Sequence, residues 1–213
     1  MLVMAIMTSA QTKSLKMSGI SADEMLPEGW TLLAHDENDI NHDYIPDLVV
    51  IALPDFSENI TIREDGYKIN RNQPIVAIYF GEGGVYKLWN SSIGIIEGAD
   101  DFSSLDDVSA SISAKGVLTI GYKMFFSAGT WEAPSHKFVY RYQNHDLYLI
   151  GYDCNTLNRA TLNEEVKSYN FLTHKKQTYV VKNGAKAGKD KWENIARKPL
   201  MEFGPQPLDY IYD

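Results

Sequence analysis

The chain contains a series of paired strands, and its clearest pair is Lys137-Phe-Val-Tyr-Arg-Tyr142 followed by Leu147-Tyr-Leu-Ile-Gly-Tyr152. Both stretches are rich in the aromatic and β-branched residues that are typical of strands. The intervening Gln143-Asn-His-Asp146 supplies short polar residues that suit a tight turn. We therefore predict a β-hairpin here and an antiparallel sheet around it.

The same arrangement continues on both sides of this hairpin. Toward the C-terminus, residues 168–172 and 177–181 flank the polar turn Thr173-His-Lys-Lys176. Toward the N-terminus, residues 118–124 alternate between apolar and other side chains after a turn at Lys115-Gly116. Helical periodicity is scarce. We predict a mainly β fold, an antiparallel meander of successive hairpins that is partial-propeller-like or built of stacked sheets, with little helix.

The N-terminal half contains a strand of a different kind. Residues 48–53, Leu-Val-Val-Ile-Ala-Leu, lie between two prolines and are continuously apolar, which predicts a strand covered on both faces. Residues 30–34 form an earlier strand, and residues 74–80 and 85–89 pair around Gly81-Glu-Gly-Gly84. We also predict an exposed excursion at 55–72, an acidic loop at 100–107 and a helical segment at 192–195.

The domain organisation that we expect has three parts. Residues 1–10, Met-Leu-Val-Met-Ala-Ile-Met-Thr-Ser-Ala, resemble the apolar end and small-residue cleavage site of a signal peptide. A short apolar strand is the alternative for this segment. Residues 11–28 are a lead-in with a short helix near 22–26, and residues 29–213 form a single β-rich domain. Cleavage at this site implies a periplasmic or extracellular protein.

Composition excludes several classes of protein. The chain has 213 residues, of which 44% are hydrophobic, so it can bury a substantial core. Its net charge of −8 argues against nucleic acid as a partner. No apolar run reaches the length of a membrane span. Cys154 is the single cysteine, which excludes an internal disulfide, and its apolar surroundings predict a buried thiol.

The most specific chemical pattern is Asp39-Ile-Asn-His-Asp-Tyr-Ile-Pro-Asp47. Hard cations such as calcium take oxygen ligands from alternate positions of a tight loop. The candidate metal ligands are the side chains of Asp39, Asn41, Asp43 and Asp47, with the main-chain carbonyl of Ile45. The sixth position of such loops is normally a glycine with positive φ, and here it is Tyr44.

Two other interpretations of this segment remain open. Asp and Asn side chains also satisfy the backbone of ordinary acidic turns, without any ion. His35 and His42 lie close by in the sequence, so imidazole and carboxylate together are a further combination, one that suits a transition metal.

The loop and the apolar strand after it resemble the signature of FG-GAP and VCBS-type repeats, Asp-x-Asn-x-Asp-Gly-x-x-Asp followed by a strand. The resemblance covers about one repeat, roughly residues 30–90, and the rest of the chain resembles uncharacterised secreted bacterial proteins. In the repeat family the loop binds calcium and the β-blades serve adhesion or ligand binding. The resemblance therefore implies ion-ligand roles for the side chains of Asp39, Asn41, Asp43 and Asp47.

The expected function is that of a non-enzymatic binding module, with a glycan or an envelope protein as its partner. Among the aromatic residues, Trp131 lies between Gly129-Thr130 and Glu132, where a loop would expose its ring. The alternative is an exported, glycan-directed hydrolase that uses a pair of loop carboxylates. Its candidate carboxylates are Asp100, Asp101, Asp106, Asp107 and Glu132.

Overall fold

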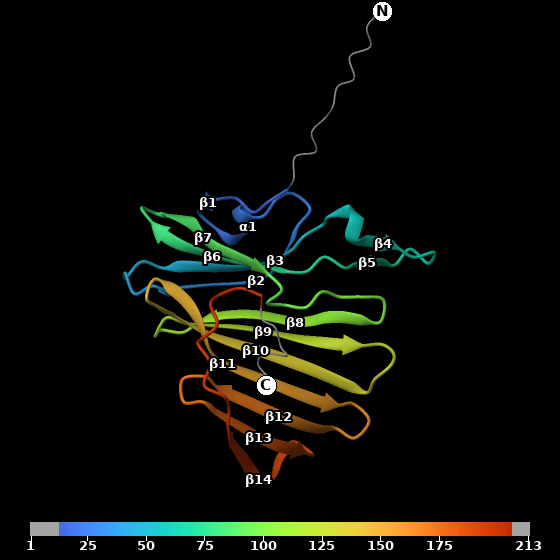
Figure 1. Cartoon of the computed structure of the whole chain (residues 1–213). Helices are drawn as coiled ribbons and strands as arrows, with labels where there is room; N and C mark the ends of the chain where they lie inside the picture. Colours follow the sequence, from blue (N-terminus) through green and yellow to red (C-terminus); the bar gives the residue numbers. More distant parts are fainter. Residues whose placement is uncertain (1–12, 206–213) are drawn as a thin grey trace, which may run out of the picture.

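The computed structural model describes residues 13–205, so the expected signal-peptide segment at 1–10 lies outside the described residues. The described chain forms two antiparallel sheets that lie next to each other, with a small hairpin at one side (Figure 1). The predicted fold class, mainly β with successive antiparallel hairpins and little helix, is confirmed. No helix in residues 13–205 is long and apolar enough to cross a membrane.

The first sheet has five strands in the order β1-β7-β6-β3-β2. Their bounds are Ser18–Gly19 for β1, Thr31–Asn38 for β2, Asp47–Leu53 for β3, Ile75–Glu82 for β6 and Val85–Ile93 for β7. The short helix α1, Ala22–Met25, lies near β1 and packs on one face of the sheet together with Trp30. Residues of the predicted lead-in thus belong to this sheet.

Strand β3 is buried on both faces, as its apolar sequence predicts. Leu48 and Val50 pack with Met25 of α1 on one side. Val49 and Ile51 point to the other side, where they join the large core that both sheets share. The alternation of side chains along a strand explains how one continuous apolar run serves two separate clusters.

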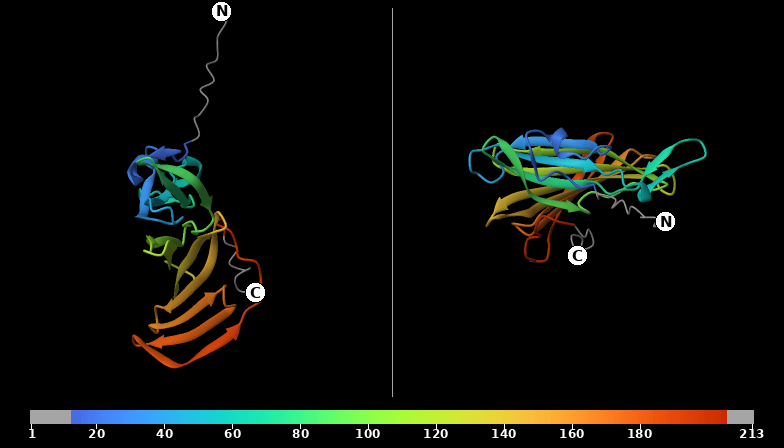
Figure 2. Two further views of the ribbon diagram at one scale, coloured as in Figure 1. Left: turned by 90° about the vertical axis from the view of Figure 1, so that its left-hand side faces the viewer. Right: turned by 90° about the horizontal axis from the view of Figure 1, so that it is seen from above.

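The second sheet is a meander of seven strands in sequence order from β8 to β14. Their bounds are Ser103–Ile112 for β8, Val117–Phe126 for β9, Glu132–Gln143 for β10, Asp146–Asn158 for β11, Asn163–Asn170 for β12, Lys175–Lys182 for β13 and Ala185–Asn194 for β14. The β10–β11 turn has positive φ at Asn144 (51°) and His145 (67°), the conformation of a two-residue hairpin turn. Figure 2 shows the meander extending away from the first sheet as one layer.

The two sheets meet where the edge strands β2 and β8 lie side by side (Figure 1). The Ile112 N–H donates to Asp36 Oδ2 at 2.6 Å, and Asn38 Nδ2 donates to the Ile112 carbonyl at 3.2 Å. Side chains of one edge therefore satisfy the backbone of the other edge. Behind this junction, Val49 and Ile78 share one core with Leu118 and Phe138.

Two local predictions are wrong. The segment at 100–107 is not all loop, because β8 begins at Ser103 and continues through a bulge between Asp106 and Ser109. Residues 192–194 end strand β14 and are not helical. The excursion at 55–72 carries a 3₁₀ turn, Ser57–Asn59, and the two-stranded hairpin of β4, Ile60–Ile62, with β5, Lys68–Asn70.

Two predictions about single side chains are confirmed. Cys154 is buried, with 7% of its surface exposed, and Trp131 is 66% exposed. Cys154 lies opposite His136 in the β10–β11 register, on the core face of the meander. Trp131 lies immediately before β10.

Candidate functional site

The acidic loop connects β2 and β3, and its side chains hydrogen-bond the loop backbone. The Asp39 carboxylate accepts from the N–H groups of His42 at 2.6 Å and Tyr44 at 3.0 Å. Asn41 Oδ1 accepts from the Asp43 N–H at 3.0 Å, and Asp43 Oδ1 accepts from the Ile45 N–H at 2.8 Å. These are turns of the kind that Asp and Asn favour.

Asp47 holds the base of the loop and is fully buried. One of its oxygens accepts from the N–H groups of Ile40 at 2.8 Å and Asn41 at 3.2 Å, and the other accepts from Gly81 at 3.0 Å on strand β6. Burial raises the pKa of the Asp47 carboxyl group, and these hydrogen bonds oppose that rise. The carboxylate therefore ties the loop to the first sheet.

The backbone at Tyr44 has the left-handed conformation that the sequence pattern assigns to a glycine. Its φ is 68°, and its side chain is 94% exposed. His42 has a φ of 66°, so the loop has two left-handed residues. Ile40, in contrast, is fully buried in the shared core and anchors the loop.

The donor set has the chemistry of a hard-cation site: three carboxylates, one amide oxygen and the Ile45 carbonyl. Asn41 Nδ2 also donates to Asp43 Oδ2 at 3.1 Å, so these two side chains lie together. Within residues 13–205, no group of three or more His, Cys, Asp or Glu side chains is gathered closely enough to hold a metal ion. The side chains predicted as metal ligands thus lie in one loop, and they form hydrogen bonds with its backbone.

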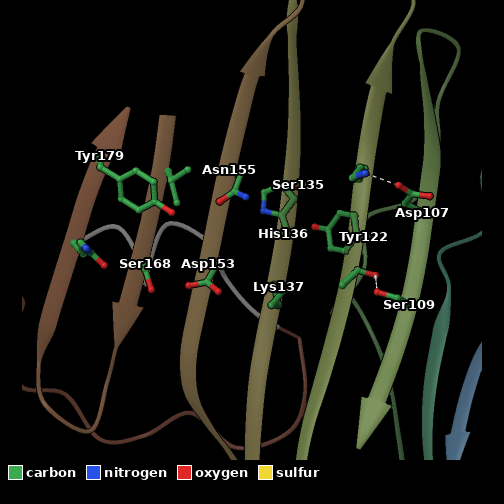
Figure 3. A pocket seen from close by; sticks show the side chains of 14 residues that line it. Asp107, Ser109, Tyr122, Ser135, His136, Lys137, Asp153, Asn155, Ser168 and Tyr179 are labelled. Atoms are coloured by element: carbon green, nitrogen blue, oxygen red, sulfur yellow. Dashed lines mark hydrogen bonds and ion pairs between the residues drawn. The ribbon is translucent and has the colours of Figure 1, made fainter. Parts of the chain in front are cut away.

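A second site, which the sequence did not predict, is a groove across the meander (Figure 3). Its volume is about 470 Å³, and residues from every strand between β8 and β13 line it. Its lining includes the polar side chains of Ser109, Ser135, Asp153, Asn155, Ser168 and Tyr179.

Strand register builds the groove from two adjacent rows of side chains. One row runs across the strands through Ser109, Gly121, Lys137, Asp153, Ser168 and Gln177. The other row runs through Lys123, Ser135, Asn155, Val166 and Tyr179. The residues between the two rows in sequence, such as His136 and Cys154, point into the core, because side chains alternate along a strand.

Gly121 lies in the first row and adds depth to the groove. A Cβ atom built at this position would lie 2.8 Å from Ser109 Oγ. A larger residue would therefore collide with the serine or fill the space between the strands.

The charges in the groove are balanced. Lys123 forms an ion pair with Asp107, whose carboxylate raises the pKa of the Lys123 ammonium. Lys137 lies opposite Asp153 in the β10–β11 register. At the far end, Lys186 lies 4.4 Å above the Tyr179 ring and forms an ion pair with Asp190. The arrangement suits a ligand without large net charge.

His136 belongs to the strand that carries Ser135 and Lys137, and it packs in the core. Its Nδ1 lies 2.6 Å from the Tyr152 hydroxyl, and its ring stacks on Tyr122 with centroids 4.9 Å apart. Burial lowers the His136 pKa to about 4. The ring is therefore neutral at physiological pH.

The carboxylates of the hydrolase alternative lie in different surroundings. Asp100 accepts from the N–H groups of Phe102 at 2.8 Å and Ser103 at 2.7 Å, which lowers the pKa of its carboxyl group. Asp101 pairs with Arg71, whereas Asp107 lies in the groove and pairs with Lys123.

No family model, curated protein or solved structure matches the chain at a significant level.

Proposed function

We propose that the protein is an exported binding module that binds a glycan in the groove of the meander. The observation that carries this proposal is the groove itself, a polar surface of hydroxyl, amide and paired charged groups with Tyr179 at one end. Sugars are bound by planar polar groups that exchange hydrogen bonds with hydroxyls and by aromatic rings that pack on their apolar faces.

The pairing of charges favours binding over hydrolysis. Glycoside hydrolysis needs one carboxylic acid with a raised pKa and a second carboxylate across the scissile bond. In the groove, Asp107 is engaged with Lys123, and Asp153 lies opposite Lys137. Asp100 has a lowered pKa, the reverse of what a general acid requires.

A glycan array followed by calorimetry with the bound sugars tests the proposal. Tyr179→Ala should weaken binding at least tenfold because it removes the aromatic surface at the end of the groove. Tyr44→Ala is the matched control, since Tyr44 is 94% exposed and lies outside the groove. Absence of any bound glycan would refute the proposal. Turnover of a glycoside that a single Asp or Glu substitution abolishes would establish the hydrolase instead.

The acidic loop has a supporting role in this proposal. Its resemblance to FG-GAP and VCBS-type loops and its left-handed Tyr44 support calcium binding by Asp39, Asn41, Asp43, Asp47 and the Ile45 carbonyl. Bound calcium would neutralise the three carboxylates and hold the β2–β3 connection.

Calcium should raise the melting temperature of the protein relative to a chelator, because an ion that binds only the folded state stabilises it. At a calcium concentration about 100 times the Kd, the stabilisation is about 2.7 kcal/mol. Magnesium is the control, since it demands a smaller, near-octahedral site. An unchanged melting temperature at millimolar calcium would eliminate the ion site.

A further inference from the structure

One polar atom in the groove has no partner. Asn155 Oδ1 is buried and accepts no hydrogen bond within residues 13–205. Asn155 lies between Ser135 and Val166 in the strand register, in the middle of the second row of the groove. A buried amide oxygen needs a donor. The oxygen is closed to solvent in this conformation, so a ligand N–H or O–H group reaches it once the Asn155 side chain turns its amide toward the groove.

An apolar subsite adjoins Asn155. A cavity of about 240 Å³ is lined by Phe125, Ala133 and Leu157, together with Asp106 and Glu164, and it shares Asn155, Ser135 and Lys123 with the polar groove. Ala133 and Leu157 face each other in the β10–β11 register, two residues along the strands from Ser135 and Asn155. Hydrocarbon surface therefore begins next to the unpaired oxygen.

Arg159 packs on the Phe125 ring and is itself held by backbone carbonyls. The Arg159 guanidinium lies 4.6 Å from the ring centroid, and its Nη2 donates to the carbonyls of Phe126 at 2.6 Å and Thr130 at 2.9 Å. Phe125 remains 43% exposed and Leu157 36% exposed. The subsite is thus a fixed apolar surface that is open to a small ligand group.

We propose that the ligand of the groove is an N-acylated amino sugar or a chain of such sugars. Its amide N–H donates to Asn155 Oδ1, its acyl methyl group packs on Phe125 and Leu157, and its sugar hydroxyls bind the Ser135 and Asp153 side of the groove. This inference rests on the proposed function, since it names the ligand class of the same site. It explains why an unpaired oxygen and an apolar surface adjoin each other in an otherwise polar groove.

Three β-1,4-linked trimers that differ only at carbon 2 of each sugar test the ligand class by calorimetry and by NMR titration. They are the trimers of N-acetylglucosamine, glucosamine and glucose. The N-acetylglucosamine trimer should bind at least tenfold more tightly than the other two, because it alone supplies both the amide N–H and the methyl group. Equal binding of the three would overturn the acyl-group inference and leave the glycan proposal intact. If none of the three trimers binds and the glycan array is empty, both the acyl-group inference and the glycan proposal are refuted.

Substitutions test which residues produce the preference for the N-acetylated trimer. Asn155→Leu removes the acceptor at similar size and should abolish the preference for the N-acetylated trimer, whereas Asn155→Asp keeps an acceptor oxygen and should retain it. Leu157→Ser should reduce the preference, and Leu162→Ser is its control, because Leu162 is 64% exposed and outside both cavities. Unchanged near-UV circular dichroism shows that each variant is folded. A preference that survives in folded Asn155→Leu would refute the assignment.

Discussion

At the scale of single residues, Asp47 shows how a side chain that looks like a metal ligand also serves the fold. Its two oxygens accept three backbone N–H groups, two from the loop and one from strand β6. A buried carboxylate with this many donors is a structural element whether or not an ion is bound. Its role can therefore be tested without calcium.

Asp47→Asn should destabilise the protein by about 2–4 kcal/mol, because the amide offers one acceptor oxygen and turns its NH₂ group toward backbone donors. Asp43→Asn, which changes an exposed loop position in the same way, should cost less than about 1 kcal/mol. Urea unfolding in the presence of a chelator measures both. Similar losses for the two variants would contradict the role of Asp47.

His136 makes the protein sensitive to acid. Its pKa of about 4 in the folded protein lies below the ordinary value of 6.5. Between these values the unfolded chain takes up a proton that the native state excludes, so stability falls as the pH falls from 6.5 to 4. The full difference amounts to about 3 kcal/mol.

The comparison that isolates this effect is His136→Gln, which lacks a titrating ring. Asp47 has the opposite effect on the pH dependence of stability. Because its pKa is raised in the folded protein, its protonation at low pH favours the folded form. The difference in unfolding free energy between wild type and variant, measured from pH 7 to 4, should therefore shift by about 3 kcal/mol in favour of the variant. A difference that is independent of pH would exclude a buried neutral His136.

At the scale of elements, the β8–β9 turn supports the acidic loop. Gly116 in this turn has a φ of 65°. A Cβ atom at this position would lie 2.7 Å from His42 Cε1 and 3.0 Å from the carbonyl oxygens of Asp39 and Ile40. The turn and the loop belong to different sheets, so their contact joins the two sheets at a second place.

Gly116→Ala should destabilise the protein by roughly 2–4 kcal/mol, the sum of a left-handed alanine and a steric collision with the loop. Gly184→Ala is the matched control, because Gly184 has a φ of 73° but no atom within 4 Å of the added Cβ. It should lose only about 1 kcal/mol. Thermal unfolding distinguishes the two, and equal losses would refute the contact.

The elements also show how far the sequence alone could predict the structure. The central strand around Val50 and the hairpin at Asn144 were predictable, because their signals are local: a continuous apolar run and turn residues. Strand β8 was missed in part, since its first half is polar and interrupted by a bulge. Strand β14 was missed because it is an exposed edge strand without apolar alternation.

The two candidate sites differ in the same way. The acidic loop could be found because all its oxygens lie within nine consecutive residues, 39–47. The groove could not, since Ser135, Asn155 and Tyr179 become neighbours only through the register of the four strands β10 to β13. The alternation of polar residues with Phe138 and Tyr152 was a visible signal, but it does not specify which strands pair.

At the scale of the whole molecule, the two sheets depend on one core. Val49 and Ile78 of the first sheet pack in the same cluster as Leu118 and Phe138 of the meander. Separating the sheets would expose both sets of side chains to water, which is unfavourable for each.

The described chain should therefore unfold in a single cooperative transition, although proteins of this size often populate intermediates. Trp30 packs in the cluster of the first sheet and reports on it, and Trp131 and Trp192 report on the meander. One variant should retain a single tryptophan in the first sheet, and a second variant a single tryptophan in the meander. The urea midpoints of the two variants by fluorescence should agree with each other and with the midpoint by circular dichroism. Two separate midpoints would show that the sheets are independent units.

The buried Cys154 gives the protein an internal reporter. It is the single thiol of the chain, and it precedes Asn155 on strand β11, with its side chain on the opposite face of the sheet. A thiol reagent reaches it only when β11 separates from its neighbours, so the labelling rate under native conditions measures that opening. A ligand bound across the groove would slow the reaction without touching the sulfur.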